Sequence, residues 1–310
     1  MRSATTQAIL LGMALGDALG RPVEFQKFAQ IEAQYGPGGI QHPPDPALYT
    51  DDTQTAIEVT EGLLFEAGLN APLPDRLHRI RARLLQWLEA AASRSPESAT
   101  LAAVQRLAGG ADPAHSGSPD ADGSGCVPRM VSIGCFYRDD PAQLHTTAEA
   151  VCRVTHAHPD AVAASIAMAY TIALTVNGAH ITEYVRKIMS FCDGLSEELD
   201  MALLRVGHVL GWTDEIAAMR HIGSGWKATE AVALALYCVL RYEGDYTGCV
   251  RRAANFSGAS TTVAALAGAV SAARSGTPDA LPADWVARCE NRDYLLDLGK
   301  RMTATQPDRR

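Results

Sequence analysis

The chain of 310 residues is long enough for one large domain or two ordinary ones. Its composition, with 47% hydrophobic and 20% charged residues, is that of a globular protein with a sizeable core. The formal net charge of −8 argues against a broad basic surface for nucleic acid. A small phosphorylated ligand stays open, because loop amides and helix N-termini bind phosphate without net positive charge. The seven cysteines form no CxxC pair, so neither a disulfide framework nor a zinc site is indicated.

Two apolar segments are candidates for a targeting signal or a membrane span. The N-terminal segment contains Asp17 and several glycines, which makes it a poor secretory signal. Residues 161–179 are uncharged, but they are rich in alanine and include Ser165, Thr171 and Asn177. This composition favours a buried core helix over a membrane span. We therefore expect a cytoplasmic protein that does not cross a membrane, and its oligomeric state is left open.

Alanine-rich segments with helical periodicity follow one another along the chain, and no convincing alternating run predicts a strand. We expect an all-α fold, a compact single-domain bundle of many helices over residues 1–302, with a frayed tail over residues 303–310. Residues 109–128 are rich in glycine, serine and aspartate and predict a long functional or mobile loop. The expected helices are 5–19, 53–67, 74–92, 96–107, 141–154, 159–176, 181–192, 197–209, 226–242 and 261–274.

The segment Thr50-Asp51-Asp52 stands at the start of an expected helix. Adjacent carboxylates flanked by hydroxyls are hard oxygen ligands that suit Mg²⁺ or Ca²⁺. Aspartate and threonine are also ordinary residues at helix N-termini, where they cap the helix and interact with its dipole. The spacing alone therefore leaves both a metal site and a simple helix cap open.

Two glycine-flanked segments are candidates for ligand contact. Gly123, Ser124, Gly125 and Cys126 precede Arg129, and close glycines let backbone amides approach a phosphate. The alternative is a flexible loop that enters a helix. In the second segment, Gly225 precedes Trp226, whose ring could stack on a base, although aromatic residues at helix starts usually serve packing.

Two further segments precede expected helices. Thr155-His156-Ala157-His158-Pro159 has two histidines that would face one side only in an extended chain, so a metal site and a helix cap both stay open. Residues 255–262 have the sequence NFSGASTT. On its own, this segment indicates a helix start that is rich in hydroxyl groups.

The order of these motifs is more informative than any one of them. The segments LGMALGDALGRPVEF, YTDDTQ, GSGCVPRM, THAHPDAV, GSGWKATEAVALAL and NFSGASTTVAALAGAV resemble the successive motifs of the ADP-ribosylglycohydrolase family, to which the dinitrogenase-reductase-activating glycohydrolase belongs. The resemblance extends from Leu10 to about Gly276. The first two segments are the most specific, and the others corroborate them.

The resemblance implies a bundle of many helices around a binuclear Mg²⁺ site and the hydrolysis of a bond from ribose C1 that releases ADP-ribose. It implies metal ligands at Thr50, Asp51 and Asp52, and a catalytic role for Glu24 beside Asp51 and Asp52. The resemblance further implies ligand contacts from the glycine loop, Arg129, His158, Gly225 and Trp226. It makes ADP-ribose or an ADP-ribosylated protein the expected partner.

The last motif departs from the family's pattern, which reads G-G-D-T-D-T. Here Ala259 and Thr261 stand where that pattern has aspartates, and Thr262 remains as a hydroxyl ligand. Because Mg²⁺ prefers carboxylates, we expect one ion at most.

Two functions follow from these observations. The first is an ADP-ribosylhydrolase that acts on a modified side chain, most plausibly arginine. The alternative is an ADP-ribose-binding protein that recognises modified partners without efficient turnover, supported by the changes at Ala259 and Thr261. A hydrolase of another ribosyl linkage, or a metal-independent variant, is a third reading.

Overall fold

The computed structural model describes residues 1–65, 68–90 and 94–304. Within these ranges the chain forms 16 α-helices and no sheet, which confirms the expected all-α fold. The helices are α1 Ser3–Gly20, α2 Phe28–Tyr35, α3 Asp51–Leu63, α4 Leu73–Glu89, α5 Ser98–Ala108, α6 Met130–Phe136, α7 Pro141–Arg153, α8 Pro159–Val176, α9 Tyr184–Phe191, α10 Glu197–Val209, α11 Glu215–Ile222, α12 Ala228–Arg241, α13 Tyr246–Ala254, α14 Ser260–Ser275, α15 Ala283–Arg288 and α16 Arg292–Ala304.

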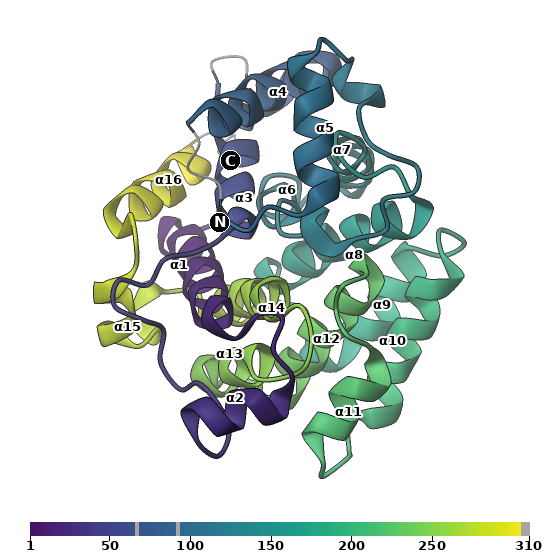
Figure 1. The fold of residues 1–310 in the computed structure, drawn as a ribbon. Coiled ribbons are helices and arrows are strands. Elements are labelled where there is room, and N and C mark those ends of the chain that lie inside the picture. The colour runs from purple at the N-terminus through teal and green to yellow at the C-terminus, as the bar shows by residue number, and fades with distance from the viewer. Residues whose placement is uncertain (66–67, 91–93, 305–310) are drawn as a thin grey trace.

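The helices α1 and α14 form the centre of the bundle and lie side by side (Figure 1). Glycines on α1 allow the two backbones to touch. A Cβ atom on Gly16 would lie 2.0 Å from the carbonyl oxygen of Ala264, and one on Gly20 would lie 2.4 Å from that of Ser260. No side chain fits at these distances, so the glycines are required for the approach. The approach brings the last turn of α1 beside the first turn of α14, where two of the sequence motifs meet.

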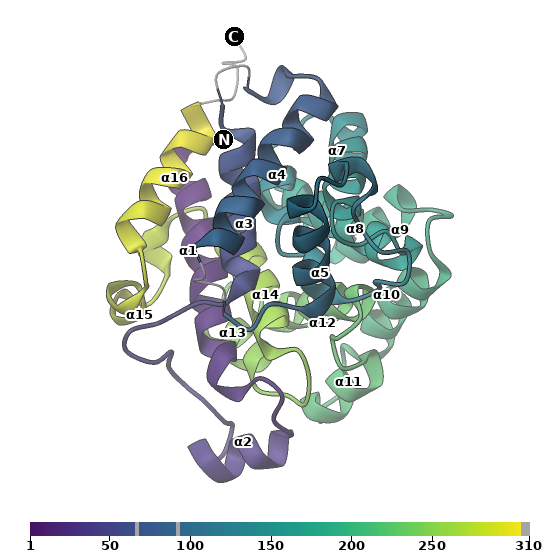
Figure 2. The same cartoon turned by 45° about the horizontal axis from the view of Figure 1, so that its top comes forward.

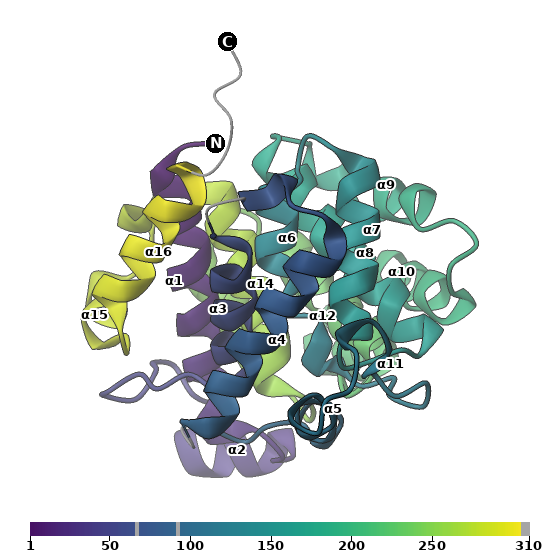
Figure 3. The same cartoon turned by 90° about the horizontal axis from the view of Figure 1, so that it is seen from above.

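The remaining helices surround this pair. Helix α16 packs along α1 (Figure 2), and α3 lies between α1 and α4 (Figure 3). Helix α8 contacts α6, α7, α12 and α14. It is long and apolar enough to cross a membrane, yet 78% of it is buried inside the bundle, as expected for a core helix.

All ten expected helices are present. Helices α8 and α10 have the expected bounds, and the other eight have shifted ends. The expected end of α4 at Ala92 lies outside the described residues. Helix α3 begins at Asp51 rather than Thr53, so both aspartates lie in its first turn. It ends at Leu63, and the expected end at Ala67 lies outside the described residues. Helix α12 begins at Ala228 rather than Trp226. The start of α12 is delayed because the backbone around Trp226 pairs with the glycine loop: the Ser124 N–H donates to the Trp226 carbonyl at 3.0 Å.

Six helices were not predicted from the sequence, namely α2, α6, α11, α13, α15 and α16. They contain only six to thirteen residues each. Helices this short depend on tertiary packing more than on their own periodic pattern. Helix α16 extends to Ala304, so the first two residues of the expected frayed tail are helical, while residues 305–310 lie outside the described part of the chain.

Candidate active site

Four acidic side chains gather where α1 ends and α3 begins. Asp17 comes from α1, Glu24 follows the short 3-10 turn η1 (Arg21–Val23), and Asp51 and Asp52 occupy the first turn of α3. Asp17, Asp51 and Asp52 are 0%, 6% and 4% exposed. The charges of Asp51, Asp17 and Glu24 all act on Asp52, so the four groups share one small region of low solvent access.

Burial is the main reason that these acids hold their protons more tightly than usual. It raises the pKa of Glu24 to about 8, of Asp51 to about 7 and of Asp17 to about 6. The pKa of Asp52 lies well above its usual range because of burial and then the charges of its three acidic neighbours. At neutral pH the cluster therefore retains protons that exposed carboxyl groups would release, and Glu24 is largely neutral.

Asp17 organises the start of α3. One of its oxygens accepts hydrogen bonds from the Thr50 N–H at 3.0 Å, the Thr53 N–H at 3.1 Å and the Thr53 hydroxyl at 2.6 Å. Its other oxygen, Oδ1, is buried and has no hydrogen-bond partner among the described residues. Thr50 itself caps α3, since its hydroxyl accepts from the Asp52 N–H at 3.3 Å. The helix-cap interpretation of Thr50 is therefore confirmed, and Asp17 adds an acid that the sequence analysis did not assign to the site.

The last sequence motif reaches this cluster from the opposite side. The Thr262 hydroxyl donates to Asp52 at 2.9 Å. The hydroxyl and backbone N–H of Thr261 bind Glu24 and lower its pKa, although burial outweighs them. Ala259, at the other position where the family's pattern has an aspartate, is buried and brings only a methyl group. This side of the site therefore supplies hydroxyl groups that donate to the acids.

The glycine loop lies beside the segment of Trp226. Ser124 to Cys126 form the 3-10 turn η4 (Ser124–Cys126), and Gly123 forms a backbone bridge with Lys227. Arg129 is fully buried beneath the loop. Its guanidinium donates to the Gly125 carbonyl at 2.9 Å and to two threonine hydroxyls, those of Thr155 and Thr100. Arg129 thus supports the shape of the loop, and its contact with a ligand stays a prediction.

The glycine loop packs against the carboxylate of Glu97, which pairs with the buried His156. His156 Nε2 lies 2.8 Å from the Glu97 carboxylate. A Cβ on Gly123 would meet that carboxylate at 1.8 Å, so the glycine allows the acid to pack against the loop. The Glu97 N–H also donates to Asp51 at 3.3 Å, which links the loop's support to the acid cluster. Although burial opposes both shifts, the pair lowers the pKa of Glu97 and, together with the Cys126 thiol, raises that of His156.

His158 and Cys126 form hydrogen bonds with residues outside the acid cluster. His158 caps α8, where its Nδ1 accepts from the Asp160 N–H at 3.2 Å. The histidine beneath the glycine loop is His156, two residues earlier, so the helix-cap interpretation describes His158. Cys126 is fully buried and its thiol lies 3.5 Å from the Ser165 hydroxyl. Direct ligand contact by either side chain stays a prediction.

A pocket of about 380 Å³ opens beside Glu24 and is also lined by Arg21, Pro22, Phe25 and Ser95. At its edge the rings of Phe25 and Trp226 stack 5.2 Å apart and 11° from parallel. Both rings remain accessible, with exposed fractions of 74% and 41%.

Trp226 is held in place by the loop before it. Gly225 adopts a positive φ of 78°, and its N–H and that of Ser224 both donate to Glu230. The Ala259 N–H donates to the Ser224 carbonyl, which ties this loop to the start of α14. Glu24 and Phe25, the stacking partner of Trp226, therefore line one pocket.

The structure thus brings most of the predicted site residues together: the acids, Thr50, Thr262, the glycine loop and the segment of Trp226. It adds Asp17, Glu97 and His156, which the sequence analysis did not assign. Asp17 had a signal, since a lone acid on an apolar helix is unusual. His156 lay in a motif already singled out, and nothing in its sequence distinguished it from His158. Glu97 had no local signal.

The acid cluster offers oxygen ligands of the kind that bind divalent cations. Within residues 1–65, 68–90 and 94–304, no three His, Cys, Asp or Glu side chains are arranged as metal ligands are. Carboxylate oxygens are nevertheless the ligands that hard cations prefer. Asp17 Oδ1 is buried without a hydrogen-bond partner among the described residues, so it is available to accept from a donor or to bind a cation. The carboxylates of Asp51 and Asp52 therefore fit a hard cation in their chemistry, whereas Ala259 and Thr261 bring no carboxylate.

Known proteins with similar sequences cover nearly the whole chain. An uncharacterised protein of Archaeoglobus fulgidus is 25% identical over 94% of this chain and 94% of its own length. The ADP-ribosylarginine hydrolase Tri1 of Serratia proteamaculans is 19% identical over 96% of this chain and 79% of its own length. The ADP-ribosyl-[dinitrogen reductase] glycohydrolase of Rhodospirillum rubrum is 24% identical, with 90% and 88% covered.

A solved structure described as an ADP-ribosylglycohydrolase-related protein complex shares the fold. It superposes with a TM-score of 0.78 at 23% identity and covers 98% of this chain and 99% of its own. Residues 3–310 match the family described as ADP-ribosylglycohydrolase. The family and its named members indicate a hydrolase of ADP-ribosylated substrates. This chain therefore belongs to the ADP-ribosylglycohydrolase family.

Proposed function

We propose that this chain cleaves the bond between C1 of the distal ribose of an ADP-ribosyl group and an arginine side chain, releasing ADP-ribose. The observation that carries the proposal is the position of Glu24, which lines an open pocket and interacts with the buried aspartates of α3. The arginine acceptor follows the name of the Serratia relative.

In this proposal Glu24 handles the proton. Burial raises its pKa to about 8, so at neutral pH it can protonate the leaving guanidine nitrogen as the C1–N bond breaks. The resulting carboxylate then takes the proton of the water that attacks C1. Thr261 steadies the carboxylate through its hydroxyl and N–H. The aspartates of α3 orient the ribose hydroxyls.

Asp51 and Asp52, with the hydroxyls of Thr50 and Thr262, would hold a single Mg²⁺. When bound, the ion would polarise the ribose hydroxyls and a water molecule. The glycine loop offers backbone amides to the diphosphate, and Trp226 offers an accessible ring to the adenine.

A second candidate function is ADP-ribose binding without efficient turnover. It is favoured by one observation, the neutral side of the site, where Ala259 and Thr261 supply no carboxylate. In this case the cleft would bind ADP-ribose or a modified partner, and Glu24 would remain bonded to Thr261.

The test measures release of ADP-ribose from an ADP-ribosylated arginine peptide, with Mg²⁺ and with chelator, for the parent chain and for Glu24→Gln. We expect release by the parent with Mg²⁺ and a loss on the order of 10²- to 10⁴-fold in Glu24→Gln, because the amide can neither give nor accept the proton. Calorimetry with ADP-ribose is the control for binding. Binding without release would favour the second candidate, and neither binding nor release would refute both.

A further inference from the structure

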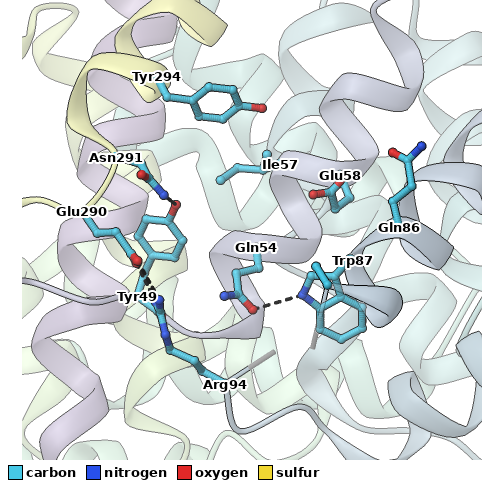
Figure 4. Close-up of a pocket in the computed structure, with 11 residues that line it drawn as sticks. Tyr49, Gln54, Ile57, Glu58, Gln86, Trp87, Arg94, Glu290, Asn291 and Tyr294 are labelled. Carbon is cyan, nitrogen blue, oxygen red and sulfur yellow. Dashed lines mark hydrogen bonds and ion pairs between the residues drawn. The ribbon is translucent and has the colours of Figure 1, made fainter. Parts of the chain in front are cut away.

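A second pocket of about 530 Å³ lies next to the first turns of α3, separate from the pocket beside Glu24. The two pockets share a wall. Arg94 lines the second pocket, and the next residue, Ser95, lines the pocket beside Glu24. Figure 4 shows the second pocket between α3, α4 and the residues before α16. Its lining residues are Tyr49, Gln54, Ile57, Glu58, Gln86, Trp87, Ala90, Arg94, Glu290, Asn291 and Tyr294.

The charged residues of this pocket neutralise one another. Arg94 binds Glu290 through two hydrogen bonds of 2.5 and 2.6 Å. Glu58 lies 2.7 Å from Arg83, which also donates to Gln86 at 3.2 Å. Each lining carboxylate therefore has an arginine partner, and Arg94, the one cation among the described lining residues, is already paired with Glu290 and does not attract a phosphate. The pocket is suited to a ligand without net charge.

Of the three aromatic residues that line the pocket, Tyr294 presents an accessible ring, whereas Tyr49 and Trp87 are buried in the wall, with 3% and 4% exposed. The Trp87 indole N–H donates to Gln54 at 3.1 Å, and the Tyr49 hydroxyl accepts from Asn291 at 3.1 Å. Tyr294 donates its hydroxyl to an acid outside the pocket, Glu61, and its ring is 38% exposed. In Figure 4 the tyrosines lie across the pocket from Trp87, with Ile57 between them. The accessible ring of Tyr294 favours a flat molecule that can stack on it.

The edges of the cavity carry groups that hydrogen-bond to a polar ring. Gln86 and Asn291 are exposed at the rim, on opposite sides of the opening (Figure 4). Carboxamides pair with the edges of heteroaromatic bases, as asparagine and glutamine do with adenine. A volume of about 530 Å³ is in the range of small-molecule sites and exceeds a single ring.

We propose that this second pocket binds an uncharged planar heteroaromatic molecule of nucleoside size, and that the bound molecule influences the acid cluster. Two hydrogen bonds connect the wall of the second pocket to Asp51 in the acid cluster. The Asp51 N–H donates to the Arg94 carbonyl at 3.1 Å, and the Glu97 N–H donates to the Asp51 carboxylate. Ser95 holds a positive φ of 52°, a strained conformation between these two contacts. A ligand that shifts Arg94 therefore moves the backbone that positions Asp51.

The binding test uses adenosine as the probe, with AMP as its charged counterpart, on the full chain saturated with ADP-ribose. Calorimetry should detect adenosine binding that persists under saturation, and AMP should bind about tenfold more weakly because its phosphate finds no free cation. Tyr294→Ala should weaken adenosine binding about tenfold by removing a stacking surface. Tyr294→Phe is the matched control, since it also loses the bond to Glu61 but keeps the ring, and it should bind like the parent.

Trp226→Ala alters only the other cleft and separates the two sites. If it abolishes adenosine binding while Tyr294→Ala leaves it unchanged, adenosine occupies the cleft beside Glu24 and the second site is refuted. Absence of adenosine binding at millimolar concentration, or AMP binding as tightly as adenosine, also overturns the proposal. These results do not depend on hydrolysis, so failure of the proposed function appears separately, as failure to bind or release ADP-ribose.

The influence on the acid cluster rests on the proposed function and has its own readout. Saturating adenosine should change the rate of ADP-ribose release in the parent and in Tyr294→Phe, and should leave the rate of Tyr294→Ala unchanged at the same concentration. An unchanged rate in a parent chain that calorimetry shows to be saturated would overturn the coupling.

Discussion

The two sides of the cleft contrast in their chemistry. One side, here called the carboxylate side, consists of Asp17, Glu24, Asp51 and Asp52. The other, the hydroxyl side, consists of residues 257–262 at the start of α14. The carboxylate side crowds four acids into a buried region, whereas the hydroxyl side only donates hydrogen bonds to them.

The contrast shows how the side chains on one side of the site can change without loss of the fold. Helices α1 and α14 touch through Gly16 and Gly20 whatever the side chains at Ala259 and Thr261. The Thr262 hydroxyl donates to Asp52, and Thr261 donates to Glu24, whose pKa burial raises to about 8. These hydrogen bonds stabilise the acids in the absence of a second ion. They do not add the negative charge that a second ion would need for binding.

The largest expected effect is that of Asp52→Ala on the carboxylate side. It should abolish Mg²⁺ binding and lower ADP-ribose release on the order of 10²-fold or more. The metal-free protein should melt at a higher temperature than the parent, because one of four mutually repelling buried acids is gone. Mg²⁺ titration, release assays and melting curves check this, with Asp279→Ala, on the distant turn η6 (Pro278–Ala280), as control. Hydrolysis at the parent's rate in the presence of chelator would contradict a metal-dependent role for Asp52.

The next effect comes from rebuilding the hydroxyl side. The double change Ala259→Asp and Thr261→Asp should tighten Mg²⁺ binding about tenfold or more, because each carboxylate adds a charged oxygen ligand. Without metal the double variant should melt at a lower temperature than the parent, since six acids then repel one another. Calorimetric Mg²⁺ titration and melting curves of both proteins test the prediction. A folded double variant with no gain in Mg²⁺ affinity would show that the two positions do not face the metal.

The pH dependence of stability should report the carboxylate side directly. Asp17, Asp51 and Glu24 have folded pKa values raised to about 6, 7 and 8 from 3.8 and 4.5. Between these values the folded protein holds protons that the unfolded chain releases, so the metal-free protein should lose stability as pH rises through this window. Melting temperatures from pH 4 to pH 9, with chelator and with Mg²⁺, measure the effect.

The Mg²⁺-dependent increase in melting temperature should be larger at pH 8 than at pH 5, because the ion binds the deprotonated acids. An increase that stays constant across this range would indicate that Mg²⁺ binds elsewhere. The Asp52→Ala variant is the control and should show a smaller increase at every pH.

The smallest effect should be that of Thr262→Val on the hydroxyl side. It removes the hydrogen bond to Asp52 and keeps the shape of the side chain, so we expect a loss of about 1 kcal/mol in the free energy of unfolding. Thr262→Ser keeps the hydroxyl and should restore most of the Mg²⁺ affinity that Thr262→Val loses. Denaturant melts and Mg²⁺ titrations of the three proteins decide the outcome. A Val variant with the parent's Mg²⁺ affinity would exclude the hydroxyl as a ligand.

Several parts of the site could be read from local sequence. The aspartates of α3, the hydroxyls before α14 and the glycine loop all stand at helix starts or in turns, which short-range patterns predict. Other parts could not. Arg129 follows a glycine loop, yet its guanidinium is buried under the loop and binds protein oxygens. Trp226 reads as a helical residue, yet a backbone bond to Ser124 holds it in the preceding loop.

The sequence by itself determined that this chain is all-helical, that its motifs follow the order of one family, and that residues 257–262 contain hydroxyl groups and no carboxylate. These properties are local, because helical periodicity and motif identity depend on neighbours in the chain. Only the tertiary structure decided that Asp17 anchors α3 and that His156, not His158, pairs with Glu97. Those contacts join segments 33 and 59 residues apart. They arise because close helix packing and burial, which no short segment encodes, bring separate polar groups into one unsolvated region.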